Sequence, residues 1–139
     1  MPDCKHLTCI ICPQSCNITV TCAQDGSVTA VSGNKCARGD TYVRSEIVNP
    51  VRVVTSLVRV KGGSIAMCPV RTDRPVTKAM VREIALAVEK LTINAPVNLG
   101  DVVVQNILGS GANLVTTRPI PLKGNEGELG SSRADGHGP

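Results

Sequence analysis

Four cysteines near the N-terminus combine a residue type and a spacing that suit metal binding. Cys9, Cys12 and Cys16 lie within eight residues, and Cys36 follows after 19 intervening residues. Three thiolates from one short loop can point at a common centre, and a fourth from elsewhere completes four-fold ligation. A [4Fe–4S] cluster needs such a set, because each iron takes one thiolate. The spacing therefore predicts an iron–sulfur cluster held by these four cysteines.

Two other interpretations of the same thiols remain open. The four cysteines also suit a structural Cys4 zinc site, although such sites usually combine two C-x2-C pairs and Cys36 has no pair partner. Cys9 and Cys12 by themselves form the C-x-x-C of thiol-redox proteins. The βαβ pattern that accompanies that motif in thioredoxin-like folds is missing from the sequence.

The remaining cysteines and the first histidine have simpler expected roles. Cys22 ends a predicted strand and Cys68 lies inside one, so we expect both to be small buried hydrophobic residues. Cys4 is expected to be an incidental thiol on a mobile terminus, with a spare ligand as the alternative. His6 is expected to be a solvated loop residue.

A β-hairpin is predicted between the cysteine loop and Cys36. Residues 18–21 and 28–31 alternate as strands do, and Asp25-Gly26 is a turn signal between them. The returning strand brings Cys36 back towards the loop. Residues 1–16 are expected to be a loop, and residues 40–47 a short helix with Asp40 as its N-cap.

The second half of the chain predicts a sheet with one main helix. Strands are expected over 51–60, 64–71, 102–108 and 113–117, and a helix over 78–91 capped by Thr77. Gly109-Ser110-Gly111 is a hairpin turn rather than a dinucleotide-binding loop, because Leu114 stands where that motif needs glycine. The sequence predicts an α+β protein with an iron–sulfur domain at 1–48, an α+β domain at 49–122 and a disordered tail at 123–139.

Composition excludes several classes of function. The 139 residues carry a net charge of +4 and a single aromatic residue, Tyr42, so nucleic-acid binding is not expected. The sequence has no apolar run long enough to predict a membrane-spanning helix, so membrane insertion is not expected, and it shows no apolar leader. We therefore expect a cytoplasmic protein with reduced thiols. Seven basic residues lie between positions 52 and 82: Arg52, Arg59, Lys61, Arg71, Arg74, Lys78 and Arg82. We expect them to form either a docking face for an acidic partner or an ordinary solvated surface.

The sequence shows no Ser–His–Asp set, no paired carboxylates and no phosphate loop. This absence favours a non-catalytic redox subunit over a self-sufficient enzyme, although it does not decide the question. Tyr42 is expected either to pack over the cluster or to anchor the core.

The N-terminal part resembles the [4Fe–4S] domain of molybdopterin oxidoreductases. The resemblance rests on Cys9-x2-Cys12-x3-Cys16 followed by Cys36-Ala37-Arg38-Gly39, and it covers residues 5–45. In that family the last motif is C-x-K-G, and Arg38 replaces its lysine here. The resemblance implies a cluster but no molybdenum, because the large pterin-binding domains do not fit in this chain.

A longer resemblance covers nearly the whole predicted ordered region. Its motifs include Leu7–Pro13, Gly33–Gly39, Asn49–Arg52, Pro69–Thr72 and Ala95–Val102 through Thr117-Arg118. They are similar to a small bacterial family known for conserved CxxC pairs. The genes of that family tend to lie beside flavin-dependent dehydrogenases resembling anaerobic glycerol-3-phosphate dehydrogenase and beside pyridine-nucleotide oxidoreductases. The resemblance implies an accessory redox subunit with such a flavoprotein as its partner.

Overall fold

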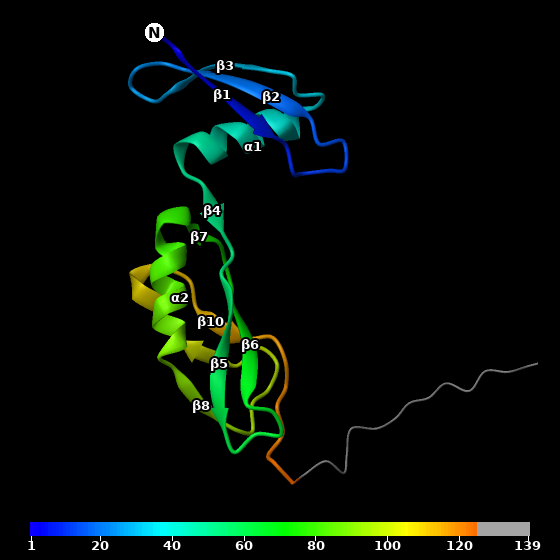
Figure 1. Cartoon of the computed structure of the whole chain (residues 1–139), viewed down its shortest axis with the longest axis vertical. Coiled ribbons are helices and arrows are strands. Elements are labelled where there is room, and N and C mark those ends of the chain that lie inside the picture. The colour runs from blue at the N-terminus through cyan, green and yellow to red at the C-terminus, as the bar shows by residue number, and fades with distance from the viewer. Residues whose placement is uncertain (125–139) are drawn as a thin grey trace, which may run out of the picture. The chain divides into compact units, whose positions relative to one another are not determined.

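The chain forms two compact units, and the computed structural model describes its residues 1–124 (Figure 1). Unit 1 comprises Met1–Arg52 together with Thr77–Ala79, and unit 2 comprises Val53–Val76 and the residues from Met80 onward. Each unit has its own sheet, its own helix and its own hydrophobic cluster. The predicted α+β class is therefore confirmed.

Unit 1 is a three-stranded antiparallel sheet with one helix packed against it (Figure 1). Its strands lie in sequence order: β1 (Asp3–Thr8), β2 (Asn17–Cys22) and β3 (Val28–Ser32). In β2 every second side chain is buried, which is the period of a strand with one covered face. The helix α1 (Ala37–Val48) covers that face and contributes Val43 to the cluster with Ile18, Val20 and Cys22.

The predicted hairpin is confirmed, but two expectations for unit 1 are wrong. Residues 3–8 form a strand that pairs with β2 along its whole length, rather than part of a loop. Leu7 is the only large apolar residue in this strand, so no apolar alternation marks it. The helix begins at Ala37 because Cys36, with extended backbone, occupies the N-cap position. Asp40 instead lies in the first turn, where its carboxylate suits the helix dipole and accepts a hydrogen bond from Arg44 Nε at 2.9 Å.

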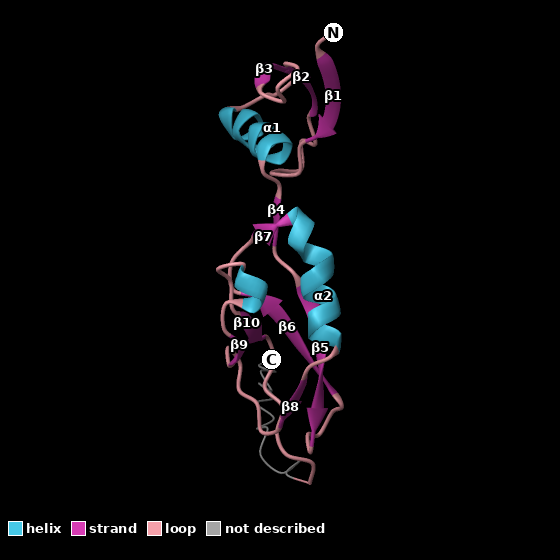
Figure 2. Cartoon of the chain, turned by 90° about the vertical axis from the view of Figure 1, so that its left-hand side faces the viewer, coloured by secondary structure: helices cyan, strands magenta, loops and turns pink. Residues whose placement is uncertain are grey.

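Unit 2 is a five-stranded sheet with a helix on one face (Figure 2). The strand order is β8-β5-β6-β10-β9, with bounds β5 (Thr55–Lys61), β6 (Met67–Thr72), β8 (Thr92–Asn94), β9 (Val102–Val104) and β10 (Leu114–Thr116). β5 and β8 are parallel, and the other neighbours are antiparallel. The helix α2 (Val81–Glu89) buries Ile84 and Val88 in the same cluster as Val58 and Val70 of the sheet.

Several elements of the second half are shorter than predicted. The strand expected over 51–60 divides into β4 (Val51–Arg52) and β5, and the short β4 pairs with β7 (Val76–Thr77). Thr77 therefore lies in a strand and caps no helix, and a single 3-10 turn, η1 (Lys78–Met80), precedes α2. β8 has no counterpart among the predicted strands, since three residues are too few to show a period.

The connection between β9 and β10 agrees with the predicted turn. The strand expected over 102–108 ends at Val104, and a 3-10 turn, η2 (Ile107–Gly109), follows it. The segment then leads into the antiparallel strand β10 instead of a helix, which excludes the dinucleotide-binding interpretation.

The described residues contain no helix that is long and apolar enough to cross a membrane. Of the predicted tail at 123–139, residues 125–139 lie outside the part of the chain that the structure describes.

Candidate metal centre

Three of the four predicted ligands lie in the loop that joins β1 to β2. The Cys9 N–H donates a hydrogen bond to the Cys16 carbonyl oxygen at 2.9 Å, and this bond closes the loop at its base. Within the loop, the Ser15 N–H donates to the Cys12 carbonyl oxygen at 3.3 Å. Cys9 is buried, whereas Cys12 and Cys16 are half-buried. The fold thus confines three thiols to one short loop with a fixed base.

Cys36 lies at the N-terminus of α1. Its carbonyl oxygen accepts a hydrogen bond from the Gly39 N–H at 3.2 Å, which begins the helix. The backbone N–H groups of Gly39 and then of Arg38 also face the thiol and hold the pKa of Cys36 below its ordinary value. The thiolate is the form that binds a metal ion, so this position favours the ligating form of the side chain.

Gly39 allows the first turn of α1 to approach the cysteine loop. A Cβ atom at this buried glycine would lie 3.2 Å from Ile18 Cδ1, 3.3 Å from Asn34 Cβ and 3.8 Å from Cys9 Sγ. The turn that begins at Cys36 is therefore packed directly against Cys9 and the start of β2. A larger residue at position 39 would push the helix away from the loop.

Gly33 controls the path by which the chain returns to the loop. It has a φ of +89°, and a Cβ atom there would overlap the backbone oxygen of Asn17, the residue after Cys16. Only glycine combines this left-handed conformation with so close a backbone crossing. The crossing carries the chain from β3 over the start of β2 and on to Cys36.

These elements bring the first turn of α1, which begins at Cys36, against Cys9 in the loop that joins β1 to β2. Figure 1 shows that loop and the start of α1 at the same end of unit 1. Among residues 1–124, no three Cys, His, Asp or Glu side chains lie close enough together to hold a metal ion in this conformation. Cys9 and Cys16 are packed in the cluster of unit 1, whereas Cys36 is exposed. Four-fold ligation by these cysteines therefore requires a rearrangement of their side chains from this conformation.

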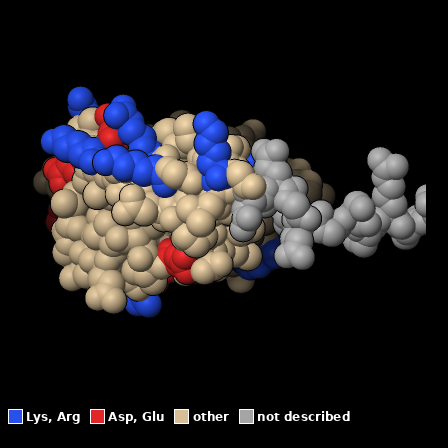
Figure 3. Space-filling model, turned by 90° about the horizontal axis from the view of Figure 1, so that it is seen from below, with Lys and Arg blue, Asp and Glu red and all other residues tan. Residues whose placement is uncertain are grey.

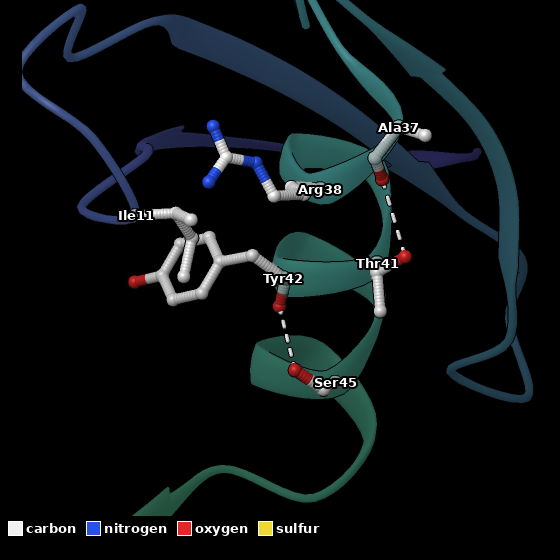
Figure 4. Close-up of a pocket in the computed structure, with 6 residues that line it drawn as sticks. All are labelled: Ile11, Ala37, Arg38, Thr41, Tyr42 and Ser45. Atoms are coloured by element: carbon white, nitrogen blue, oxygen red, sulfur yellow. Dashed lines mark hydrogen bonds between the residues drawn. The ribbon is translucent and has the colours of Figure 1, made fainter.

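An open groove of about 480 Å³ lies beside the loop. It is lined mainly by apolar atoms of Ile11 from the loop and of Ala37, Arg38, Thr41, Tyr42 and Ser45 from α1 (Figure 4). The Ile11 side chain lies beside the Tyr42 ring, and Arg38 extends from the preceding turn of α1. The Thr41 and Ser45 hydroxyls donate to backbone carbonyl oxygens at 3.1 and 2.8 Å, so they are already satisfied within the helix.

Tyr42 packs against the hydrophobic cluster of unit 1 as well as lining the groove. Burial first, and then the nearby Glu46 carboxylate, raise the pKa of its hydroxyl above the ordinary value. The core-anchor expectation for Tyr42 is therefore confirmed, and its packing over a cluster stays a prediction.

A bidentate ion pair between Arg52 and Glu46 fixes the C-terminal end of α1. Arg52 donates from Nη1 to Glu46 Oε2 at 3.0 Å and from Nη2 to Oε1 at 2.5 Å. This contact holds the pKa of the Glu46 carboxyl below its usual range. It ties the helix to β4 and so helps to fix the orientation of the Cys36 end.

The cysteines outside the predicted set behave largely as expected. Cys22 and Cys68 are buried, and burial raises the pKa of the Cys68 thiol. Cys4 is exposed on β1, and so is His6, whose Nδ1 hydrogen-bonds Thr19 Oγ1 at 3.1 Å. Their expected places, on a mobile terminus and in a loop, are wrong, because β1 pairs with β2.

Sequence reasoning did not single out Ile11, and it did not predict the close contacts that Gly33 and Gly39 allow at this site. The turn signal Gly33-Asn34 is visible in the sequence, but the close crossing that it permits is not. Gly39 follows Cys36 in the motif, and its contact with Ile18 and Cys9 emerges only from the packing of α1.

Comparison with curated proteins found no match. Among solved structures, the chain is similar to the NMR structure of Clostridium perfringens protein CPE0013, with a TM-score of 0.51 and 26% identity over 58% of this chain and 94% of that one. The sequence profile of a family described as "Protein of unknown function (DUF1667)" matches residues 37–118. The match begins one residue after Cys36 and so includes α1 and the strands of unit 2, but none of the four predicted ligands. The chain belongs to the DUF1667 family.

Proposed function

We propose that unit 1 binds a [4Fe–4S] cluster through Cys9, Cys12, Cys16 and Cys36, and that the protein is a cytoplasmic electron-transfer subunit. The observation that carries the proposal is the packing of the first turn of α1, which begins at Cys36, against Cys9 in a loop with two more cysteines. A flavin-dependent dehydrogenase resembling glycerol-3-phosphate dehydrogenase, or a pyridine-nucleotide oxidoreductase, is the proposed partner. The choice of partner rests on the sequence resemblance alone.

The donor set suits such a group. Four thiolates are the ligands that a [4Fe–4S] cluster takes, and a bound cluster supplies one-electron redox chemistry. The loop provides three donors from a base fixed by the Cys9–Cys16 hydrogen bond, and Cys36 provides the fourth from a position whose N–H groups favour the thiolate. The Cys36 side chain is exposed and is not packed in the hydrophobic cluster of unit 1.

The surroundings of the loop suit a redox site. Ile10 and Ile11 leave 72% and 46% of their surface exposed beside the ligands, and Ile11 lines the apolar groove. Apolar side chains around a metal site limit the access of water and so tune its potential. The groove also offers a partner protein a close approach to the loop.

The small core of unit 1 favours a second candidate, a structural zinc ion bound by the same four thiols. Its hydrophobic cluster contains five buried residues: Cys9, Ile18, Val20, Cys22 and Val43. Units with so small a core often depend on a metal for stability. Zinc meets that need without any redox role.

Anaerobic reconstitution of the full chain with iron and sulfide separates the two candidates. The proposal predicts a brown protein with a broad visible absorbance that dithionite bleaches. Each of the variants Cys9→Ser, Cys12→Ser, Cys16→Ser and Cys36→Ser should lose most of that absorbance, whereas Cys4→Ser, an exposed thiol outside the set, should keep it. A colourless protein that binds zinc tightly and unfolds on chelation would establish the zinc candidate and refute the cluster.

A further inference from the structure

One face of the unit 2 sheet carries exposed side chains in the described part of the chain, residues 1–124. The covered face carries buried residues such as Val58, Val70 and Leu114, which pack with α2. Because strand side chains alternate, the residues between them point to the other side, called here the open face. On β5, β6, β9 and β10 the open face consists of Thr55, Leu57, Arg59, Lys61, Met67, Pro69, Arg71, Val102 and Val115.

The register of β5 and β6 intermixes basic and apolar side chains on the open face. Leu57 lies directly opposite Pro69, and Arg59 lies opposite Met67. Arg71 lies two residues further along β6 from Pro69, on the same face. Side chains in such positions are neighbours, so these residues form one continuous surface.

Three large apolar side chains of the open face are exposed. Leu57 and Val102 each leave 51% of their surface exposed, and Met67 leaves 38%. Single exposed apolar residues are ordinary, but several on one flat face are typical of an interaction surface.

The positive charges of the open face are not neutralised within the described part of the chain. Among residues 1–124, no Asp or Glu lies within ion-pair distance of Arg59, Lys61 or Arg71. By contrast, Arg52 and Arg74 are paired with Glu46 and Asp73. Figure 3 looks at the end of unit 2 that carries the β5–β6 turn and shows several Lys and Arg side chains along one side, with Asp or Glu atoms among those at its left end.

We propose that the open face of unit 2 docks an acidic protein whose surface combines carboxylates with exposed apolar side chains. Three positive charges that have no ion-pair partner among residues 1–124 select a negative partner, and the apolar residues between them supply area that becomes buried on binding. This inference does not depend on the cluster, because no cysteine of the proposed centre lies in unit 2.

Two other occupants fit the open face less well. The bases of a nucleic acid would find no aromatic side chain to stack on, and the open face offers only three positive charges to its phosphates. A second copy of the chain, docked through the same face, would bring like charges together.

Site-specific photo-crosslinking in the cells of origin tests the location of the docking surface. A photo-reactive phenylalanine derivative is placed at position 57 or 67 of the full chain. The control position is 86, because Leu86 on α2 is 49% exposed but lies outside the open face. The proposal predicts that positions 57 and 67 capture the same acidic protein, identified by mass spectrometry, and that position 86 does not.

Binding of that purified protein then tests the chemistry. The double variant Arg59→Glu/Arg71→Glu should raise the Kd about tenfold or more, and added salt should weaken binding by the wild-type chain. Arg82→Glu on α2 is the matched control and should leave the Kd unchanged, and circular dichroism should show all variants folded. Three crosslinking results would each overturn the proposal: equal capture at position 86, capture of RNA, or a product that joins two copies of the chain. A crosslink within one chain, from position 57 or 67 to the C-terminal segment that carries Glu126 and Glu128, would also overturn it. So would an unchanged Kd for the double variant.

Discussion

Replacement of Gly33 by alanine should destabilise unit 1 through two separable effects. The left-handed φ of +89° costs an alanine about 1 kcal/mol. The added Cβ also overlaps the backbone oxygen of Asn17, and neither backbone segment is a flexible side-chain end that can turn aside. Overpacking of this kind costs about 1–3 kcal/mol more. The total loss should be about 2–4 kcal/mol in the free energy of unfolding.

Gly26→Ala is the matched control for Gly33→Ala. Gly26 has a similar φ of +83°, but its Cβ would meet nothing within 4 Å, so it pays only the conformational cost. The assay is urea unfolding of the full chain followed by tyrosine fluorescence. Tyr42 is the chain's only aromatic residue and lies in unit 1, so this signal reports on that unit.

The two glycine variants should differ by about 1–3 kcal/mol, with Gly33→Ala the less stable. If both lose the same amount, the close crossing over Asn17 contributes nothing. The idea that Gly33 positions the return to Cys36 would then be refuted. If the crossing matters to the metal centre as well, Gly33→Ala should also retain less iron after reconstitution than Gly26→Ala.

Two further predictions concern the packing and the ion pair that hold α1. Val43→Ala should lower the free energy of unfolding of unit 1, followed by tyrosine fluorescence, by about 2 kcal/mol. Val88→Ala, equally buried in unit 2, should leave the tyrosine unfolding curve unchanged. An equal shift of that curve in both variants would contradict separate cores. Glu46→Gln should destabilise unit 1 at neutral pH by removing the ion pair with Arg52. Because Arg52 lowers the pKa of Glu46 in the folded chain, the stabilisation is complete above the ordinary pKa of glutamate and is lost as the pH falls through the lowered value. The stability gap between wild type and Glu46→Gln should therefore close on acidification, and a gap that persists at low pH would show that the carboxylate charge is not its source.

The sequence reveals those elements whose burial follows a period. Ile18, Val20 and Cys22 alternate, so β2 is predictable, and the helical spacing of Val81, Ile84 and Val88 predicts α2. Strand β1 escapes prediction because its pairing with β2 depends on backbone hydrogen bonds rather than on an apolar face.

The candidate site is predictable in residue type but not in geometry. The spacing of the cysteines singles out the loop and Cys36, and the structure places both beside the first turn of α1. The role of Cys36 as the N-cap was not apparent, because cysteine is not among the usual capping residues. The close approaches at Gly33 and Gly39 depend on contacts between segments far apart in sequence, which no local pattern records.

The metal content of the chain, purified without oxygen and without reconstitution, tests the central proposal most directly. Iron, acid-labile sulfide and zinc are measured in the same sample, beside the Cys36→Ser variant and the Cys4→Ser control. The proposal predicts about four iron atoms and four sulfides per wild-type chain, a similar content in Cys4→Ser and a large loss in Cys36→Ser. One zinc ion per chain with no iron, or an iron content that Cys36→Ser leaves unchanged, would contradict it.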